Sequence, residues 1–169
     1  MEKNIKEKRV ALIKEYEEKN SDSFVRRKVI FGLLSAMVAT RLIYVVLNFI
    51  YSVVYKLDIP NTGYFMMVLT IVVAYVFSFF IYQAGIKPAT YLALFGGILS
   101  LISIYNNAVF MLDASDIFLS VINIAFIVTI LIQIFTMLFI IFDKKCKLYM
   151  DTMSEIQKTL TKLIKNNEI

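Results

Sequence analysis

Residues 29–55 read "VIFGLLSAMVATRLIYVVLNFIYSVVY", an apolar run whose one charged side chain is Arg41. About 20 helical residues cross a hydrocarbon core of about 30 Å, so this run is long enough to span a membrane. A charge near the centre of such a span costs about 2.5–3.5 kcal/mol on insertion scales. The stretch therefore predicts a transmembrane helix, and it raises the question of what compensates Arg41.

Three further apolar runs of similar length follow the first. Turn-forming segments separate them, reading "KLDIPNTG", "AGIKP" and "DASD" along the chain. The runs lack the alternation of polar and apolar residues that marks barrel strands. We therefore expect an all-α integral membrane protein, a four-helix transmembrane bundle over residues 29–142 (spans 29–55, 64–83, 88–112 and 117–142), with amphipathic helices at 1–28 and 143–169.

The composition agrees with a membrane protein. Of the 169 residues, 59% are hydrophobic, whereas a soluble domain has about 45–50% apolar residues. The single cysteine, Cys146, permits no internal disulfide. It follows the fourth apolar run among lysines, a position that is compatible with reversible acylation, although a free thiol is the simpler hypothesis.

Lysine and arginine are concentrated in the two tails. Residues 1–28 carry nine basic side chains and residues 143–169 carry six. The positive-inside rule therefore predicts a multi-pass plasma membrane protein with both termini in the cytoplasm. Acidic side chains interleave with the basic ones in both tails, so we expect no nucleic-acid partner.

Several kinds of chemistry have no residues to support them. The chain contains no histidine, and no aspartate or glutamate lies inside a predicted span. This argues against intramembrane proteases and against a proton relay through the bilayer. The five glycines form neither a phosphate-binding loop nor a dinucleotide fingerprint. We therefore expect no enzymatic activity, no metal and no cofactor.

Polar residues within the spans form the candidate site. Arg41 and Gln133 lie at similar depths in the first and fourth spans, and further amides lie toward the outer side. The predicted set is Arg41, Tyr44, Asn48, Asn106, Asn107, Asn123 and Gln133. Amides and tyrosines in a bundle commonly serve as interhelical hydrogen bonds. Arg41 has no carboxylate at its depth, so it requires water, a partner protein, a lipid phosphate or a bound anion.

Two patterns predict packing surfaces. Small residues recur at every fourth position of the third span, at Ala89, Ala93 and Gly97, which allows close helix approach. Heptad spacing in the C-terminal tail predicts an amphipathic assembly helix with the apolar positions Tyr149, Met153, Ile156, Leu160 and Leu163. The pattern leaves open whether these surfaces meet the same chain, a second subunit or the lipid surface.

Two classes of function remain. The first is an oligomeric channel or permeation protein, in which Arg41 and the amides line a polar path that passes an anion. The second is an accessory, immunity, regulatory or effector subunit, in which Arg41 pairs with another membrane subunit. A substrate transporter ranks third, because the spans lack the repeated Gly/Pro interruptions of broken helices. The expected partners are the lipid bilayer and either a homo-oligomer or another membrane subunit.

Overall fold

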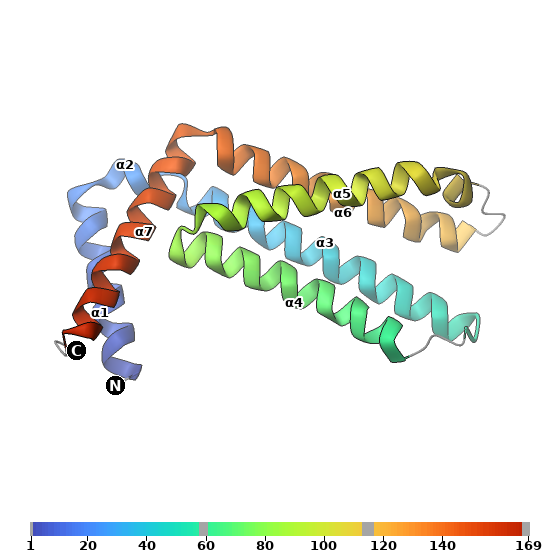
Figure 1. Ribbon diagram of the computed structural model, residues 1–169, viewed down its shortest axis with the longest axis horizontal. Helices are drawn as coiled ribbons and strands as arrows, with labels where there is room; N and C mark the ends of the chain where they lie inside the picture. The colour runs from blue at the N-terminus through green and yellow to red at the C-terminus, as the bar shows by residue number, and fades with distance from the viewer. Residues whose placement is uncertain (1, 58–60, 113–116, 167–169) are drawn as a thin grey trace.

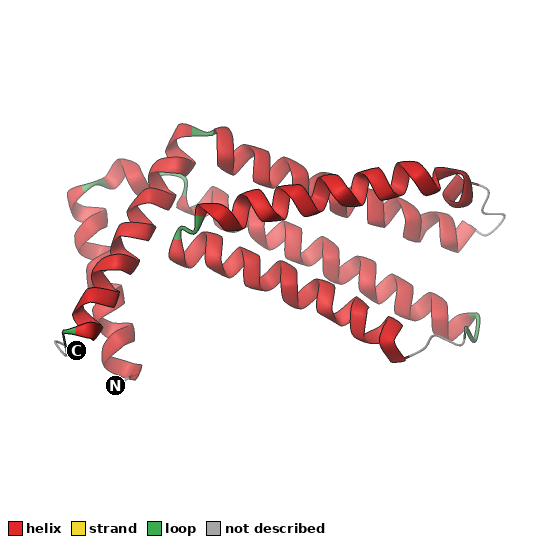
Figure 2. Ribbon diagram, viewed as in Figure 1, coloured by secondary structure: helices red, strands yellow, loops and turns green. Residues whose placement is uncertain are grey.

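The computed structural model describes the backbone of residues 2–57, 61–112 and 117–166, and it describes side chains there except at 2–3, 61–62, 64 and 103–112. All regular secondary structure in these ranges is α-helical (Figure 2), which confirms the predicted all-α class. The helices are α1 (Glu2–Lys19), α2 (Ser21–Phe24), α3 (Arg27–Val54), α4 (Asn61–Ala84), α5 (Lys87–Leu112), α6 (Ile117–Phe142) and α7 (Lys144–Lys165).

The four predicted apolar runs coincide with α3, α4, α5 and α6. Within the described residues, three helical segments are long and apolar enough to cross a membrane: Ser21–Val54, Phe65–Ala84 and Ile117–Phe142. The part of α5 with described side chains, Lys87–Ile102, is a shorter apolar helix. The remainder of the third predicted span, residues 103–112, lies outside the described side chains.

The long helices form an elongated bundle (Figure 1). Helix α3 packs against α4 and α6, and α5 packs against α6 and α4. Helices α1 and α7 lie side by side and run across one end of the bundle, where both termini are found. The two tails thus form a helical cap on the end of the bundle where α3 begins and where α4 and α6 end.

The N-terminal tail departs from the predicted single helix over residues 1–28. Asn20 adopts φ −146° and ψ 62°, and this interrupts the helix before the short α2. The local sequence "NSDS" explains the break, because short polar side chains compete for backbone hydrogen bonds and favour turns. The break directs Phe24 onto Tyr149 of α7, with ring centroids 5.9 Å apart in an edge-to-face arrangement.

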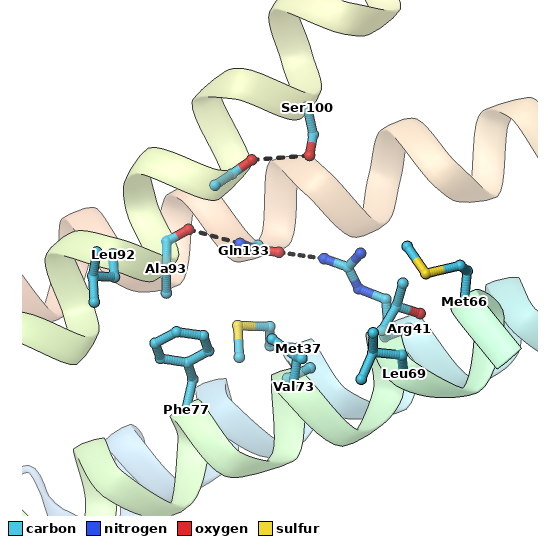
Figure 3. Close-up of a pocket in the computed structure, with 13 residues that line it drawn as sticks. Met37, Arg41, Met66, Leu69, Val73, Phe77, Leu92, Ala93, Ser100 and Gln133 are labelled. Carbon is cyan, nitrogen blue, oxygen red and sulfur yellow. Dashed lines mark hydrogen bonds between the residues drawn. The ribbon is translucent and has the colours of Figure 1, made fainter.

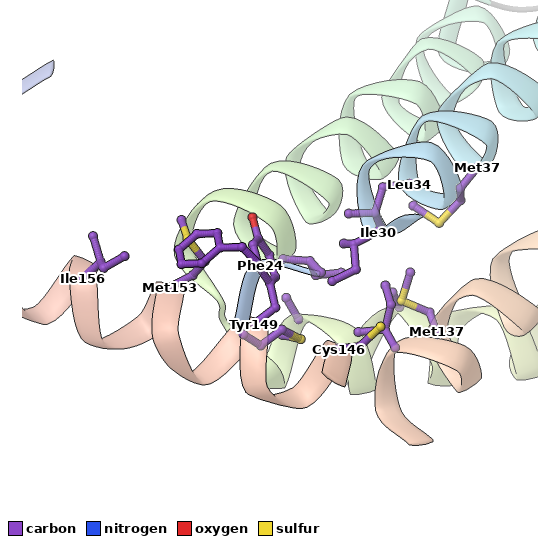
Figure 4. Close-up of a cluster of buried hydrophobic side chains, with 14 of the residues drawn as sticks. Phe24, Ile30, Leu34, Met37, Met137, Cys146, Tyr149, Met153 and Ile156 are labelled. Carbon is purple, nitrogen blue, oxygen red and sulfur yellow. The ribbon is translucent and has the colours of Figure 1, made fainter. Parts of the chain in front are cut away.

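Helix α7 is held to the rest of the chain by its apolar face. Asp143 caps its N-terminus by accepting a hydrogen bond of 2.8 Å from the Cys146 backbone N–H. Four heptad positions are buried and the fifth is partly buried; these are Tyr149, Met153, Ile156, Leu160 and Leu163. Figure 4 shows the first three beside Phe24 and side chains of the bundle. The predicted assembly face is therefore covered by the protein's own helices, which leaves it no free surface for a coiled coil.

The turn between α4 and α5 also receives α7. Gly85 adopts φ +61°, a left-handed conformation that glycine accommodates without a Cβ clash. A Cβ at this position would overlap the carbonyl oxygen of Met150 in α7. Lys87 forms an ion pair with Asp151 at 2.6 Å, and the Tyr149 hydroxyl donates to the Tyr82 carbonyl at 3.0 Å. These contacts fix α7 against the bundle.

The small residues of α5 lie on its buried side, and Gly97 faces α6. Ala89, Ala93 and Gly97 are buried, and a Cβ on Gly97 would lie 2.9 Å from Cγ1 of Ile134. This separation is shorter than carbon atoms tolerate without displacement. The predicted close helix approach is therefore made at Gly97, and it is made within one chain.

Replacement of Gly97 by alanine is expected to lower the free energy of unfolding by about 1–3 kcal/mol, because the methyl group overpacks the contact with Ile134. The adjacent Gly96→Ala is the matched control, since a Cβ there meets nothing within 4 Å. We expect Gly96→Ala to be neutral or stabilising, by up to about 1 kcal/mol from helix propensity. Thermal unfolding of both variants in the same detergent tests the contact, and equal melting temperatures would refute it.

Candidate functional site

Arg41 lies in the middle of α3 and reaches α6. Its Nη2 donates a hydrogen bond to Oε1 of Gln133, and Nε2 of Gln133 donates to the Ala93 carbonyl at 2.7 Å (Figure 3). The close approach of α5 to α6 brings that carbonyl within reach of Gln133. One relay of hydrogen bonds thus joins α3, α6 and α5, and the expected meeting of Arg41 with Gln133 is present.

This relay does not neutralise Arg41. Gln133 is an uncharged acceptor, and Nε of Arg41 is buried without a hydrogen-bond partner among the described residues. A buried polar atom left without a partner costs about 1–3 kcal/mol, and a charged group costs more. The arginine therefore retains both an unmatched charge and an unused donor.

A cavity of about 270 Å³ lies beside Arg41. Its lining comes mainly from α4 and α5, with Arg41 and Gln133 at the inner side (Figure 3). The described lining contains no acidic residue and consists of Met37, Arg41, Met66, Leu69, Thr70, Val73, Ala74, Phe77, Leu92, Ala93, Gly96, Ser100 and Gln133. It is an apolar cavity with a cation at its base.

The two hydroxyl groups in this lining are already engaged. Thr70 donates to the Met67 carbonyl at 2.7 Å, and Ser100 donates to the Gly96 carbonyl at 2.9 Å. Both bonds stay within the hydroxyl's own helix, a local pattern that threonine and serine commonly adopt. Among the described lining residues, the guanidinium of Arg41 is therefore the group that can attract a ligand of opposite charge.

The other residues of the predicted polar set do not line this cavity in the described part of the chain. Tyr44 packs on Phe126 of α6 with ring centroids 4.8 Å apart. Asn48 donates from Nδ2 to the Tyr44 carbonyl at 3.0 Å, so its amide serves α3 itself. Asn123 lies half-buried on α6, outside the lining. The side chains of Asn106 and Asn107 lie outside the described ones.

One residue beside the site, Thr129, was not predicted from the sequence. The Thr129 hydroxyl donates a bifurcated hydrogen bond to two carbonyl oxygens. These are the Thr40 carbonyl on α3, at 3.2 Å, and the Ala125 carbonyl on its own helix, at 2.8 Å. Thr129 precedes Gln133 by one helical turn and so shares its face. That spacing is the signal in the sequence, and the contact secures α3 against α6 beside Arg41.

Cys146 lies in a different environment from the one that acylation requires. The residue is fully buried where α7 meets the bundle. Burial, followed by the nearby Asp143 carboxylate, raises the pKa of the Cys146 thiol to about 12. A buried thiol with so little thiolate at neutral pH is a poor nucleophile, so the structure favours a free, structural cysteine.

No family model, curated protein sequence or solved structure matches this chain. Over the residues that the structure describes, the class of the protein is defined by an all-helical fold with three apolar helices of membrane-spanning length. Among the described residues, no group of His, Cys, Asp and Glu is placed to hold a metal ion. The distinguishing chemical feature is the guanidinium of Arg41 at the base of an apolar cavity.

Proposed function

We propose that this chain is a non-enzymatic accessory subunit of a larger membrane complex, in which Arg41 pairs with an acidic side chain on a partner's membrane helix. In this proposal, α3 to α6 cross the plasma membrane as a four-helix bundle. Both termini lie in the cytoplasm, as the basic residues of the tails favour. The partner's side chain enters between α4 and α5.

The observation that carries the proposal is the combination of an unmatched cation and apolar walls. Met66, Phe77 and Leu92 are among the side chains around the cavity, and Arg41 is its charged group. Such walls suit the apolar surface of a membrane helix, and the guanidinium suits a carboxylate, to which it can donate two parallel hydrogen bonds. Pairing would also offset the cost of holding Arg41 in the hydrocarbon region.

The carboxylate must come from a different chain. The predicted spans contain no aspartate or glutamate, so a second copy offers none at this depth. A lipid phosphate is also too distant. Arg41 lies about 21 Å along the helix axis from Arg27, whereas half the hydrocarbon core is about 15 Å thick. At this depth the guanidinium is therefore far from the phosphates on the side of Arg27. A partner helix with an acidic residue near its centre would supply a carboxylate from another chain, at the depth of Arg41.

The channel hypothesis has less support from the same contacts. A water-filled path needs polar groups that face it, and Asn48, Thr70 and Ser100 bond to their own helices. A ring of Arg41 residues in a homo-oligomer would also bring like charges together with no acid in the spans to balance them. An anion inside an oligomeric pore would be the remaining source of countercharge.

The proposal can be tested by purifying the tagged chain from its native membranes in mild detergent and measuring the complex by native mass spectrometry. We expect a stoichiometric second protein with an acidic residue inside an apolar helix. The complex should be lost with Arg41→Met and retained with Arg41→Lys. Lys144→Met is the matched control, because Lys144 lies in α7, outside the cavity lining.

A further exchange makes the test specific. Replacing the partner's acid by arginine should abolish the complex, and combining that change with Arg41→Glu should restore it. Retention of the partner by Arg41→Met would refute the proposal. A discrete homo-oligomer that passes anions in planar bilayers, with a conductance that depends on Arg41, would support the channel hypothesis in place of the accessory subunit.

A further inference from the structure

Two adjoining cavities lie on the α3–α4 side of the protein, apart from Arg41. One, of about 510 Å³, is lined by both charged and aromatic residues, including Arg27, Lys28 and Glu17. The other, of about 490 Å³, is a mainly apolar groove between α3 and α4. Phe31 and Tyr82 line both, so the two cavities adjoin at this pair of rings. Together they have a polar end and an apolar extension.

The polar end carries a fixed cation and a free one. Nε of Arg27 donates to the Tyr82 hydroxyl at 3.2 Å, and Nη1 lies 3.6 Å from the Glu17 carboxylate. Lys28 is exposed and forms no ion pair with the other described residues. One carboxylate faces two cations, so the pocket has a net positive charge, and Arg27 is held in place by its neighbours.

The apolar groove has the length of one lipid leaflet. On α3 it extends from Phe31 through Leu34 and Val38 to Leu42. At 1.5 Å per residue this is about 16 Å along the helix axis. One leaflet of the hydrocarbon core is about 15 Å thick. An acyl chain whose headgroup lies at Arg27 and Lys28 would therefore end near Leu42.

We infer that these adjoining cavities form a binding site for an anionic glycerophospholipid. The phosphate lies at Arg27 and Lys28, and one acyl chain occupies the groove between α3 and α4. The lipid belongs to the leaflet on the side where both termini are found (Figure 1). This site is independent of the cavity at Arg41, and its two parts match the two parts of the ligand.

The dimensions of the groove favour a lipid chain over a protein helix. A helix with side chains is about 10 Å wide and would occupy about 1,250 Å³ over the length of the groove. The groove offers about 490 Å³. The basic pocket at one end of the groove also fixes the orientation of a bound lipid, because the anionic headgroup can be held only at that end.

The test is binding of defined lipids to the purified full-length protein, measured by native mass spectrometry. Dipalmitoyl phosphatidylglycerol is compared with dipalmitoyl phosphatidylcholine, which has the same chains and no net charge. We expect phosphatidylglycerol to bind more tightly, and Lys28→Gln to weaken it about five-fold, as one lysine at a membrane surface does. Lys144→Gln, outside the pocket lining, is the control and should leave the affinity unchanged.

A second pair of variants tests the groove. Ser35 is exposed within its lining, so Ser35→Trp fills the chain site without disturbing the core. The neighbouring Ala36 is exposed outside the lining, and Ala36→Trp is the control. We expect Ser35→Trp alone to weaken both lipids. Equal binding of the two lipids, equal effects of the two lysine variants, or equal effects of the two tryptophan variants would each overturn the inference.

Discussion

Gly85→Ala is expected to lower the free energy of unfolding by about 3 kcal/mol or more, combining left-handed backbone strain with a steric clash. Gly85 has φ +61°, and an added Cβ would overlap the Met150 carbonyl oxygen and lie 2.8 Å from the Ser154 nitrogen. Both are backbone atoms of α7, so no rotamer change can relieve the overlap. Helix α7 must move away from the turn between α4 and α5.

The displacement of α7 can be measured by limited proteolysis together with thermal unfolding in detergent. In the variant, cleavage within α7 should accelerate and the melting temperature should fall. Gly32→Ala in α3 is the matched control, because a Cβ there meets nothing within 4 Å. A Gly85→Ala protein that melts like the wild type, with α7 equally protected, would show that the tail does not dock on this turn.

The apolar helices could be predicted because hydropathy and length decide them locally. The runs at 29–55 and 117–142 coincide with α3 and α6 to within two residues. Each run is bounded by charged or turn-forming residues, which are energetically costly inside an apolar membrane span. No knowledge of the packing was needed for these boundaries.

The docking of the tails could not be predicted in the same way. Heptad spacing in the C-terminal tail shows that one face is apolar, and that face would be buried equally well by a second subunit, by lipid or by the same chain. The choice depends on Phe24 and on Gly85, which lie far away in the sequence. Such long-range contacts leave no periodic signal around Tyr149.

The candidate site was accessible to sequence reasoning only in part. Depth alone related Arg41 to Gln133, because residues at equal distances from the span ends can meet in a bundle. The rotation of each helix about its axis decides which cavity Arg41 faces, and the Asn48 amide bonds instead to the Tyr44 carbonyl of its own helix. Rotation depends on close contacts such as Gly97 on Ile134, which the small-residue pattern indicates without naming the partner.

The hydrogen bond between Arg41 and Gln133 is the basis of the second prediction with a large expected effect on the free energy of unfolding. We expect Gln133→Leu to lower the free energy of unfolding by about 2–3 kcal/mol, because it removes a hydrogen bond to a charged group and leaves that charge without its acceptor. Arg41→Met should be less harmful, since it leaves only the neutral amide oxygen of Gln133 without its donor, while Nε2 still donates to the Ala93 carbonyl. Ser100→Ala, which changes a hydroxyl bonded within its own helix, is the control in the same cavity.

The double variant Arg41→Met/Gln133→Leu separates pairing from general packing. Replacing both members of a buried polar pair by apolar residues of similar size is often neutral or stabilising. We therefore expect the double variant to be more stable than Gln133→Leu alone, a non-additive result measured by thermal unfolding of all four proteins in one detergent. Additive losses would mean that the two side chains contribute separately. Arg41 would then be stabilised by water, and its charge would no longer require a partner protein.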